Sequence, residues 1–178
     1  MKPSEKGYIL VELLVATTIM VLASGAAGAA IFQIFRGTEH NNDHMTVVRQ
    51  VQNAGYWISR DAQMAQSVTT DDLTLPDFLV ISWTEDVVGD PIYHTATYYF
   101  EDLTDGLGKL KRNHVSTAGA DEDTLVAQYI YYDPSDVDNT SKANHEGAVS
   151  PVLTVQLTAI FKKALETREY KITHRANL

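Results

Sequence analysis

A single carboxylate, Glu12, lies at the edge of a long apolar segment of the sequence. The stretch from Leu13 to Phe35 contains no charged side chain, and at about 1.5 Å per helical residue it is long enough to cross a hydrocarbon layer of about 30 Å. Because an ionised carboxylate in lipid costs about 2.5–3.5 kcal/mol on insertion scales, Glu12 indicates a functional group that requires a positively charged partner.

Two further groups of side chains have types that suit metal binding. His40 and His44 are one helical turn apart, which is the spacing of two zinc ligands on a helix. A polar loop from Asp133 to Ser150 carries carboxylates that suit calcium; they are Asp133, Asp136, Asp138 and Glu146. The histidines lack a third ligand and the loop lacks the EF-hand spacing, so solvated polar side chains are the simpler interpretation. We therefore expect no metal and no cofactor.

Motifs for enzymatic chemistry are missing from the sequence. It has no nucleophile elbow, phosphate-binding loop or dinucleotide fingerprint, and without cysteine it has neither a disulfide nor a thiolate nucleophile. A membrane-tethered hydrolase would need a convergent histidine and carboxylate site that a sequence does not reveal. We expect no enzyme and no catalytic residue. The net charge of -9 also disfavours nucleic acid as a partner, since phosphates are held by clusters of Lys and Arg.

The elements that would position these groups are a helix followed by strands. From Thr46 to Ala65 apolar residues recur every three or four positions and define one helical face: Val47, Val51, Ala54, Ile58, Ala62 and Ala65. Six later segments, rich in β-branched and aromatic residues, predict short antiparallel strands: Phe78–Trp83, Tyr93–Phe100, Lys109–His114, Leu125–Tyr132, Val152–Phe161 and Arg168–Thr173. In Val152–Phe161 the odd positions from Leu153 to Ala159 form the predicted buried face, and Thr158 falls on the polar one. The predicted fold class is α+β, with a long N-terminal helix packed on antiparallel β-sheet.

The N-terminus resembles that of type IV prepilins and type II secretion pseudopilins. The resemblance lies in a short basic leader that ends at Gly7, the aromatic Tyr8, three apolar residues, Glu12 and a long apolar helix. It implies that a prepilin peptidase cuts between Gly7 and Tyr8 and methylates the new amine of Tyr8. It also implies that Glu12 is the assembly carboxylate, which pairs with the N-terminal amine of a neighbouring subunit. Such a pair would remove the cost of an unpaired charge and fix the axial register of two apolar helices.

The resemblance also implies a division of the chain into a leader peptide at 1–7, a transmembrane and assembly helix at 8–35, and an exported pilin-like α+β domain at 36–178. Lys2 and Lys6 favour a cytoplasmic N-terminus and a single pass through the bacterial inner membrane, which leaves the domain in the periplasm or, after assembly, outside the cell. The alternatives are a secretory signal peptide and a plain membrane anchor. Glu12 argues against the signal peptide, because a signal core tolerates an early acid poorly.

Further segments resemble the larger minor members of the family, namely minor pseudopilins of the J kind and W-type minor pilins. These segments are Tyr56–Gln63, Thr97–Glu101 and Gly108–Arg112. This similarity implies a minor structural subunit near the tip of a secretion pseudopilus or a type IV pilus, where it promotes assembly. The implied partners are other minor and major pilins or pseudopilins, the prepilin peptidase and the inner-membrane assembly platform. The alternative is a binding module for adhesion or DNA uptake, displayed on such a filament.

Overall fold

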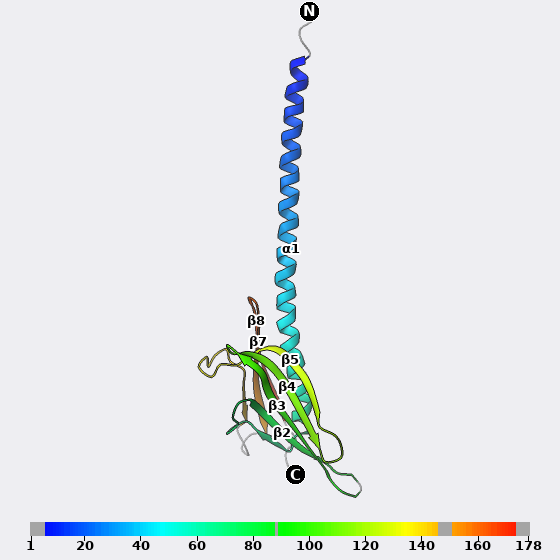
Figure 1. The fold of residues 1–178 in the computed structure, drawn as a ribbon, viewed down its shortest axis with the longest axis vertical. Coiled ribbons are helices and arrows are strands. Elements are labelled where there is room, and N and C mark those ends of the chain that lie inside the picture. Colours follow the sequence, from blue (N-terminus) through cyan, green and yellow to red (C-terminus); the bar gives the residue numbers. More distant parts are fainter. Residues whose placement is uncertain (1–5, 88, 146–150, 174–178) are drawn as a thin grey trace, which may run out of the picture. The chain divides into compact units, whose positions relative to one another are not determined.

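The fold is α+β, as predicted: one long helix and an eight-stranded antiparallel sheet (Figure 1). The computed structural model describes residues 6–87, 89–145 and 151–173, with the backbone alone for residues 6–9. The chain forms two compact units, Met1–Asn42 and Asp43–Leu178. The second unit contains the sheet together with the C-terminal part of the helix.

Helix α1 runs from Lys6 to Met64. In the first unit every described side chain from Leu10 to Asn42 is exposed. In the second unit the predicted apolar face is confirmed, because all six of its residues are fully buried; five of them lie on α1 and Ala65 follows its end. They join the sheet in one hydrophobic core with residues such as Leu79, Tyr98 and Leu157.

The sheet has the strand order β1-β2-β3-β4-β5-β7-β6, and β8 also pairs with β7. All pairs are antiparallel. The strands are β1 (Ser67–Thr69), β2 (Asp77–Glu85), β3 (Ile92–Thr104), β4 (Leu107–Ser116), β5 (Glu122–Tyr131), β6 (Lys142–His145), β7 (Val152–Phe161) and β8 (Ala164–Thr173).

All six predicted segments correspond to strands, although Tyr132 follows the end of β5, and three further details differ from the prediction. The short strands β1 and β6 were not predicted, and β6 lies in the stretch predicted as a polar loop. Its four residues carry no apolar alternation, and they are held by pairing with β7. Thr158 of β7 is fully buried instead of solvent-facing; this is tolerated because its hydroxyl shares a hydrogen bond with that of Thr167, 2.9 Å away.

A tight turn sets the pairing of β3 with β4. Asp105 and Gly106 both have positive φ, 50° and 76°, which is the backbone that the favoured two-residue hairpin loop requires. Asp-Gly suits such a loop because glycine adopts this conformation without strain and aspartate tolerates it. Farther along the hairpin, Tyr98 lies opposite Arg112.

Side chains of α1 bind the part of β5 that has no partner strand on its β7 side. Strand β5 pairs with β7 at a single position, Ile130 opposite Ala159. Beyond it, the backbone N–H of Gln128 donates to Gln50 Oε1 at 2.7 Å. The side-chain amide of Asn53 donates to the Val126 carbonyl. Two helix residues thus form hydrogen bonds with backbone groups of β5 that have no partner on a neighbouring strand.

A glycine lets β8 approach the helix closely. A Cβ atom at Gly55 would overlap the ring of Tyr170, and the Tyr170 hydroxyl donates to the Val51 carbonyl at 3.1 Å. The absence of a side chain at Gly55 therefore makes room for the aromatic ring.

Candidate functional site

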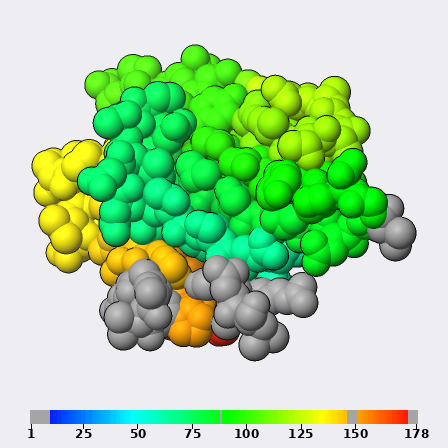
Figure 2. All heavy atoms as spheres, turned by 90° about the horizontal axis from the view of Figure 1, so that it is seen from below, coloured from blue at the N-terminus to red at the C-terminus, as the bar shows by residue number. Residues whose placement is uncertain are grey.

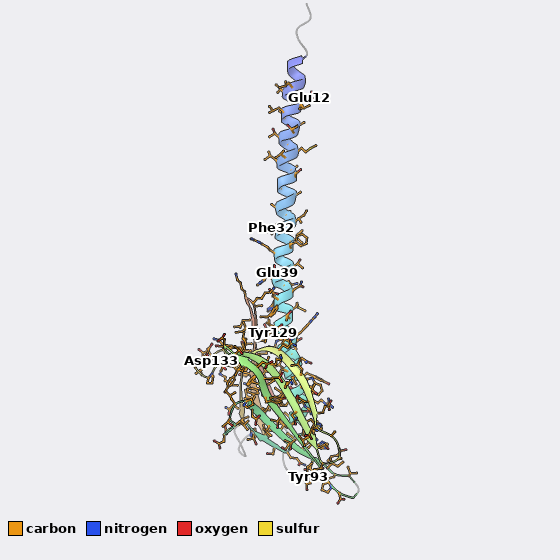
Figure 3. The ribbon with its side chains drawn as sticks, viewed as in Figure 1. Glu12, Phe32, Glu39, Tyr93, Tyr129 and Asp133 are labelled. Carbon is orange, nitrogen blue, oxygen red and sulfur yellow. The ribbon has the colours of Figure 1, made fainter. Side chains whose placement is uncertain are left out.

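The predicted assembly residues lie at the start of α1. Gly7 and Tyr8 belong to the helix, and the Tyr8 side chain lies outside the described part of the structure. Glu12, labelled in Figure 3, is exposed and makes no hydrogen bond or ion pair within the described ranges. Leader cleavage, methylation and carboxylate pairing remain predictions.

Large apolar side chains surround Glu12 and continue along the helix. They are exposed by about half or more: Leu10, Val11, Leu13, Leu14, Val15, Ile19, Met20, Val21, Leu22, Ile31, Phe32, Ile34 and Phe35. By length and composition this helix is able to serve as a membrane span or an N-terminal signal. An apolar surface of this extent is unfavourable in water, which favours contact with lipid or with another protein.

The two candidate metal sites gain no support. Among the residues that the structure describes, no group of three or more His, Cys, Asp or Glu could hold a metal ion. His40 and His44 are exposed on α1. In the polar loop, Asp133 Oδ1 accepts hydrogen bonds from the backbone and hydroxyl of Ser135 at 2.9 and 2.7 Å, and these bonds lower the Asp133 pKa. Glu146 lies outside the described residues.

The structure shows a buried charge cluster that the sequence analysis missed. Asp61 of α1 is fully buried. Arg112 of β4 donates to both of its carboxylate oxygens, from Nε at 2.6 Å and from Nη2 at 3.1 Å. The hydroxyl of Tyr98 on β3 also donates to the carboxylate, at 2.6 Å. These bonds fix the helix to two neighbouring strands.

The surroundings of this cluster raise the pKa values of Tyr98 and Arg112. Burial raises the Tyr98 pKa, and the negative charge of Asp61 raises it further, so the phenol stays a hydrogen-bond donor. Burial alone would lower the Arg112 pKa, but the hydrogen bonds and the attraction from Asp61 outweigh it and leave the pKa raised. A buried pair of this kind is stable only while both partners are present.

A sequence signal for this cluster does exist. Asp61 follows Ile58 by three positions, so it falls on the predicted apolar face of the helix. Arg112 follows Leu110 by two positions, so it falls on the buried face of its strand. Opposite charges at core positions of two predicted elements are the pattern that indicates a buried ion pair.

A pocket of about 370 Å³ opens beside the buried ion pair, between the last turns of α1 and strands β2 to β5. We call it the Trp–His pocket, and its lining residues are Trp57, Arg60, Asp61, Met64, Trp83, Glu85, His94, Arg112, His114 and Glu122. In Figure 2 the chain around the end of α1, in cyan to turquoise, shares one face of the molecule with the green strands.

Three parallel rings form the sheet side of the Trp–His pocket. Trp83 stacks with His94 and His114, with centroids 5.1 and 5.5 Å away. His94 Nδ1 and His114 Nε2 share a hydrogen bond of 3.2 Å. His94 Nε2 is shielded from solvent and has no hydrogen-bond partner in the described structure; Glu85 Oε2 lies 3.5 Å away. Burial lowers the His114 pKa, and the positive charge of Arg112 lowers it further.

Comparisons with protein-family models, with curated proteins and with solved structures gave no match. The architecture itself is pilin-like: a long N-terminal apolar helix whose C-terminal part packs on an antiparallel sheet.

Proposed function

We propose that this chain is a minor structural subunit of a type II secretion pseudopilus or a type IV pilus. The observation that carries the proposal is a single helix with two different environments. Its first part exposes a continuous apolar surface, and its last turns are built into the core of a sheet domain. In the bacterial inner membrane, lipid would cover the exposed part. In a filament, the same segment of neighbouring subunits would cover it.

Glu12 supplies the polar contact in this arrangement. Its carboxylate is exposed among apolar side chains and has no partner within the described residues. After cleavage behind Gly7, the methylated amine of Tyr8 on a neighbouring subunit would supply the positive charge. Apolar surfaces alone slide easily past each other, so the ion pair would set the axial position of each subunit.

The retained carboxylate also bears on position in the filament. An outermost subunit has no neighbour beyond it whose amine Glu12 would meet. A chain with Glu12 is therefore expected below the tip, joined to other minor subunits through its helix. Quantitative proteomics of sheared filaments checks this position, and recovery of the chain as the repeating subunit of the shaft would contradict it.

The assembly role is tested with Glu12→Leu. The variant should insert into membranes at least as well as the parent chain, because leucine is favourable in lipid. Cross-linking to neighbouring subunits should fall at least about tenfold, the effect of losing about 1.4 kcal/mol of pairing free energy. Since the chain has no cysteine, single cysteines placed at Leu13 and Ile31 report the contacts without background.

The matched control is Glu39→Leu, which removes a carboxylate of α1 that lies beyond the apolar segment. It should cross-link as the parent chain does. Equal cross-linking by Glu12→Leu and the parent chain would refute the ion-pair mechanism.

A further inference from the structure

His94 of β3 and His114 of β4 form a pair whose facing ring nitrogens share one hydrogen bond. His94 Nδ1 and His114 Nε2 lie 3.2 Å apart, and the two rings are parallel to within 4°. Trp83 of β2 is parallel to both rings, to within 8° and 4°. Only one hydrogen atom fits between two ring nitrogens at this distance, because two N–H groups that point at each other repel. The position of that hydrogen atom determines where the other protons of the pair are bound.

The surroundings of His94 indicate which of its nitrogens carries hydrogen. Its Nε2 atom is shielded from solvent and has no hydrogen-bond partner in the described structure, and Glu85 Oε2 lies 3.5 Å away. A carboxylate attracts an N–H group and repels a nitrogen lone pair. His94 therefore carries its hydrogen on Nε2, and its Nδ1 accepts the hydrogen bond from the Nε2–H of His114. In the neutral pair, His114 Nδ1 is then the nitrogen that accepts a further proton.

We propose that His94 and His114 form an acid-sensitive pair that binds one proton as a unit and excludes a second. The neutral pair and the pair with one proton from solvent both keep a single hydrogen atom between the facing nitrogens, so the contact and the stack with Trp83 persist. The first proton strengthens the contact, because a charged donor forms a stronger hydrogen bond than a neutral one. A second proton would place two N–H groups face to face and push the rings apart, which would open the sheet side of the Trp–His pocket.

Charged groups of opposite sign surround the pair. The elements packed against it contribute Arg60 and Asp61 of α1, Glu85 of β2, Arg112 of β4 and Glu122 of β5. Burial lowers the His114 pKa, the positive charge of Arg112 lowers it further, and Asp61 and Glu122 act in the opposite direction. The first proton is therefore bound below the ordinary imidazole pKa of about 6.5, and its charge then opposes the second. The two steps belong to the pair and not to either ring alone.

The inference is independent of the proposed function, because it concerns a single chain and requires no filament. The test is an NMR titration of the full chain in detergent micelles, from about pH 8.5 to about pH 5, which follows the ring nitrogens of His94 and His114. Their chemical shifts distinguish a nitrogen that carries hydrogen from one that does not, so they report both the tautomer and the number of bound protons. The exposed His40 and His44 are the reference for separate imidazoles in the same spectrum.

At about pH 8.5 both rings of the pair should carry hydrogen on Nε2. On acidification the two rings should change with one common midpoint and take up one proton in total, where two separate imidazoles would take up two by about pH 5. A hydrogen on Nδ1 of either ring at about pH 8.5, or the uptake of two protons or of none by about pH 5, overturns the proposal.

A variant of the carboxylate gives a second test. Glu85→Gln removes the negative charge that faces His94, so the midpoint of the first proton should fall by at least about 0.3 pH unit, a loss of proton affinity of about twofold. The control Glu169→Gln, at an exposed position of β8, should leave the midpoint unchanged. An equal midpoint in Glu85→Gln and the parent chain would overturn the assignment of the His94 hydrogen, on which the proposal rests. The titration of the parent chain needs no variant and remains decisive if Glu85→Gln fails to fold.

Discussion

Removing one member of the buried ion pair should cost the sheet domain a large part of its stability. In Asp61→Leu, the guanidinium of Arg112, which is only 5% exposed, loses both of its acceptor oxygens, and the Tyr98 hydroxyl loses its acceptor. An uncompensated buried charge of this kind costs about 3–5 kcal/mol. Since whole domains are stable by only about 5–15 kcal/mol, the loss should be plain in an unfolding experiment.

Removing both charges should cost less than removing either one. In the double variant Asp61→Leu with Arg112→Met, no charge is left buried, and apolar side chains fill the space. The remaining penalty is the unsatisfied hydroxyl of Tyr98, about 1–3 kcal/mol. The two single substitutions are therefore expected to be strongly non-additive, as they are for residues in one network. Adding Tyr98→Phe should recover most of what remains.

The assay is urea unfolding of the full chain in detergent, followed by tryptophan fluorescence, with the slope of the transition checked for constancy. Lys171→Met on β8 is the control, because it breaks an exposed ion pair with Glu169. The free energy of unfolding should then change by less than about 1 kcal/mol. The reasoning fails if Asp61→Leu costs no more than this control, or if the double variant loses the sum of the two single losses.

The remaining predictions concern packing, titration and processing. Gly55→Ala should lower the urea midpoint, because its Cβ meets the ring of Tyr170 and overpacking costs about 1–3 kcal/mol, whereas Gly37→Ala, with open space around it, should not; equal midpoints would contradict the close packing. The His114 pKa is lowered in the folded chain, so the unfolded chain binds more protons just below the ordinary value of about 6.5, and stability should fall as the pH drops through that value. In His114→Gln this slope should flatten, and an unchanged slope of urea midpoint against pH would exclude the histidine as its source. Gly7→Asp should leave the leader attached in cells that contain a prepilin peptidase, which N-terminal mass spectrometry checks; a chain cut after residue 7 would refute the cleavage prediction.

The parts of the fold that follow from periodic patterns were predictable from the sequence. The helix face from Val47 to Ala65 is fully buried, because a spacing of three and four places side chains on one side of a helix. The main strands were predictable for the same reason, with a period of two. Strands β1 and β6 were not, since their three and four residues hold too few apolar side chains to show a period and depend on the strands beside them.

The Trp–His pocket was beyond prediction for a different reason. Its residues come from one helix and four strands, and no local pattern states that Trp57 and His114 will meet. The register of β3 with β4 and of β4 with β5 determines which strand residues line the pocket. The assembly residues show the reverse case, because Gly7, Tyr8 and Glu12 form a short local motif that is visible in sequence and stays a prediction in the structure of one chain.

The amide side chains of α1 that bind β5 also occupy backbone groups to which another chain could add a strand. An unpaired strand edge is a template on which another chain can add a strand and begin to aggregate. Gln50 and Asn53 occupy one donor and one acceptor of that edge from within the same molecule. With these two groups occupied, the addition of a foreign strand at this position would have to break existing hydrogen bonds and is therefore less favourable.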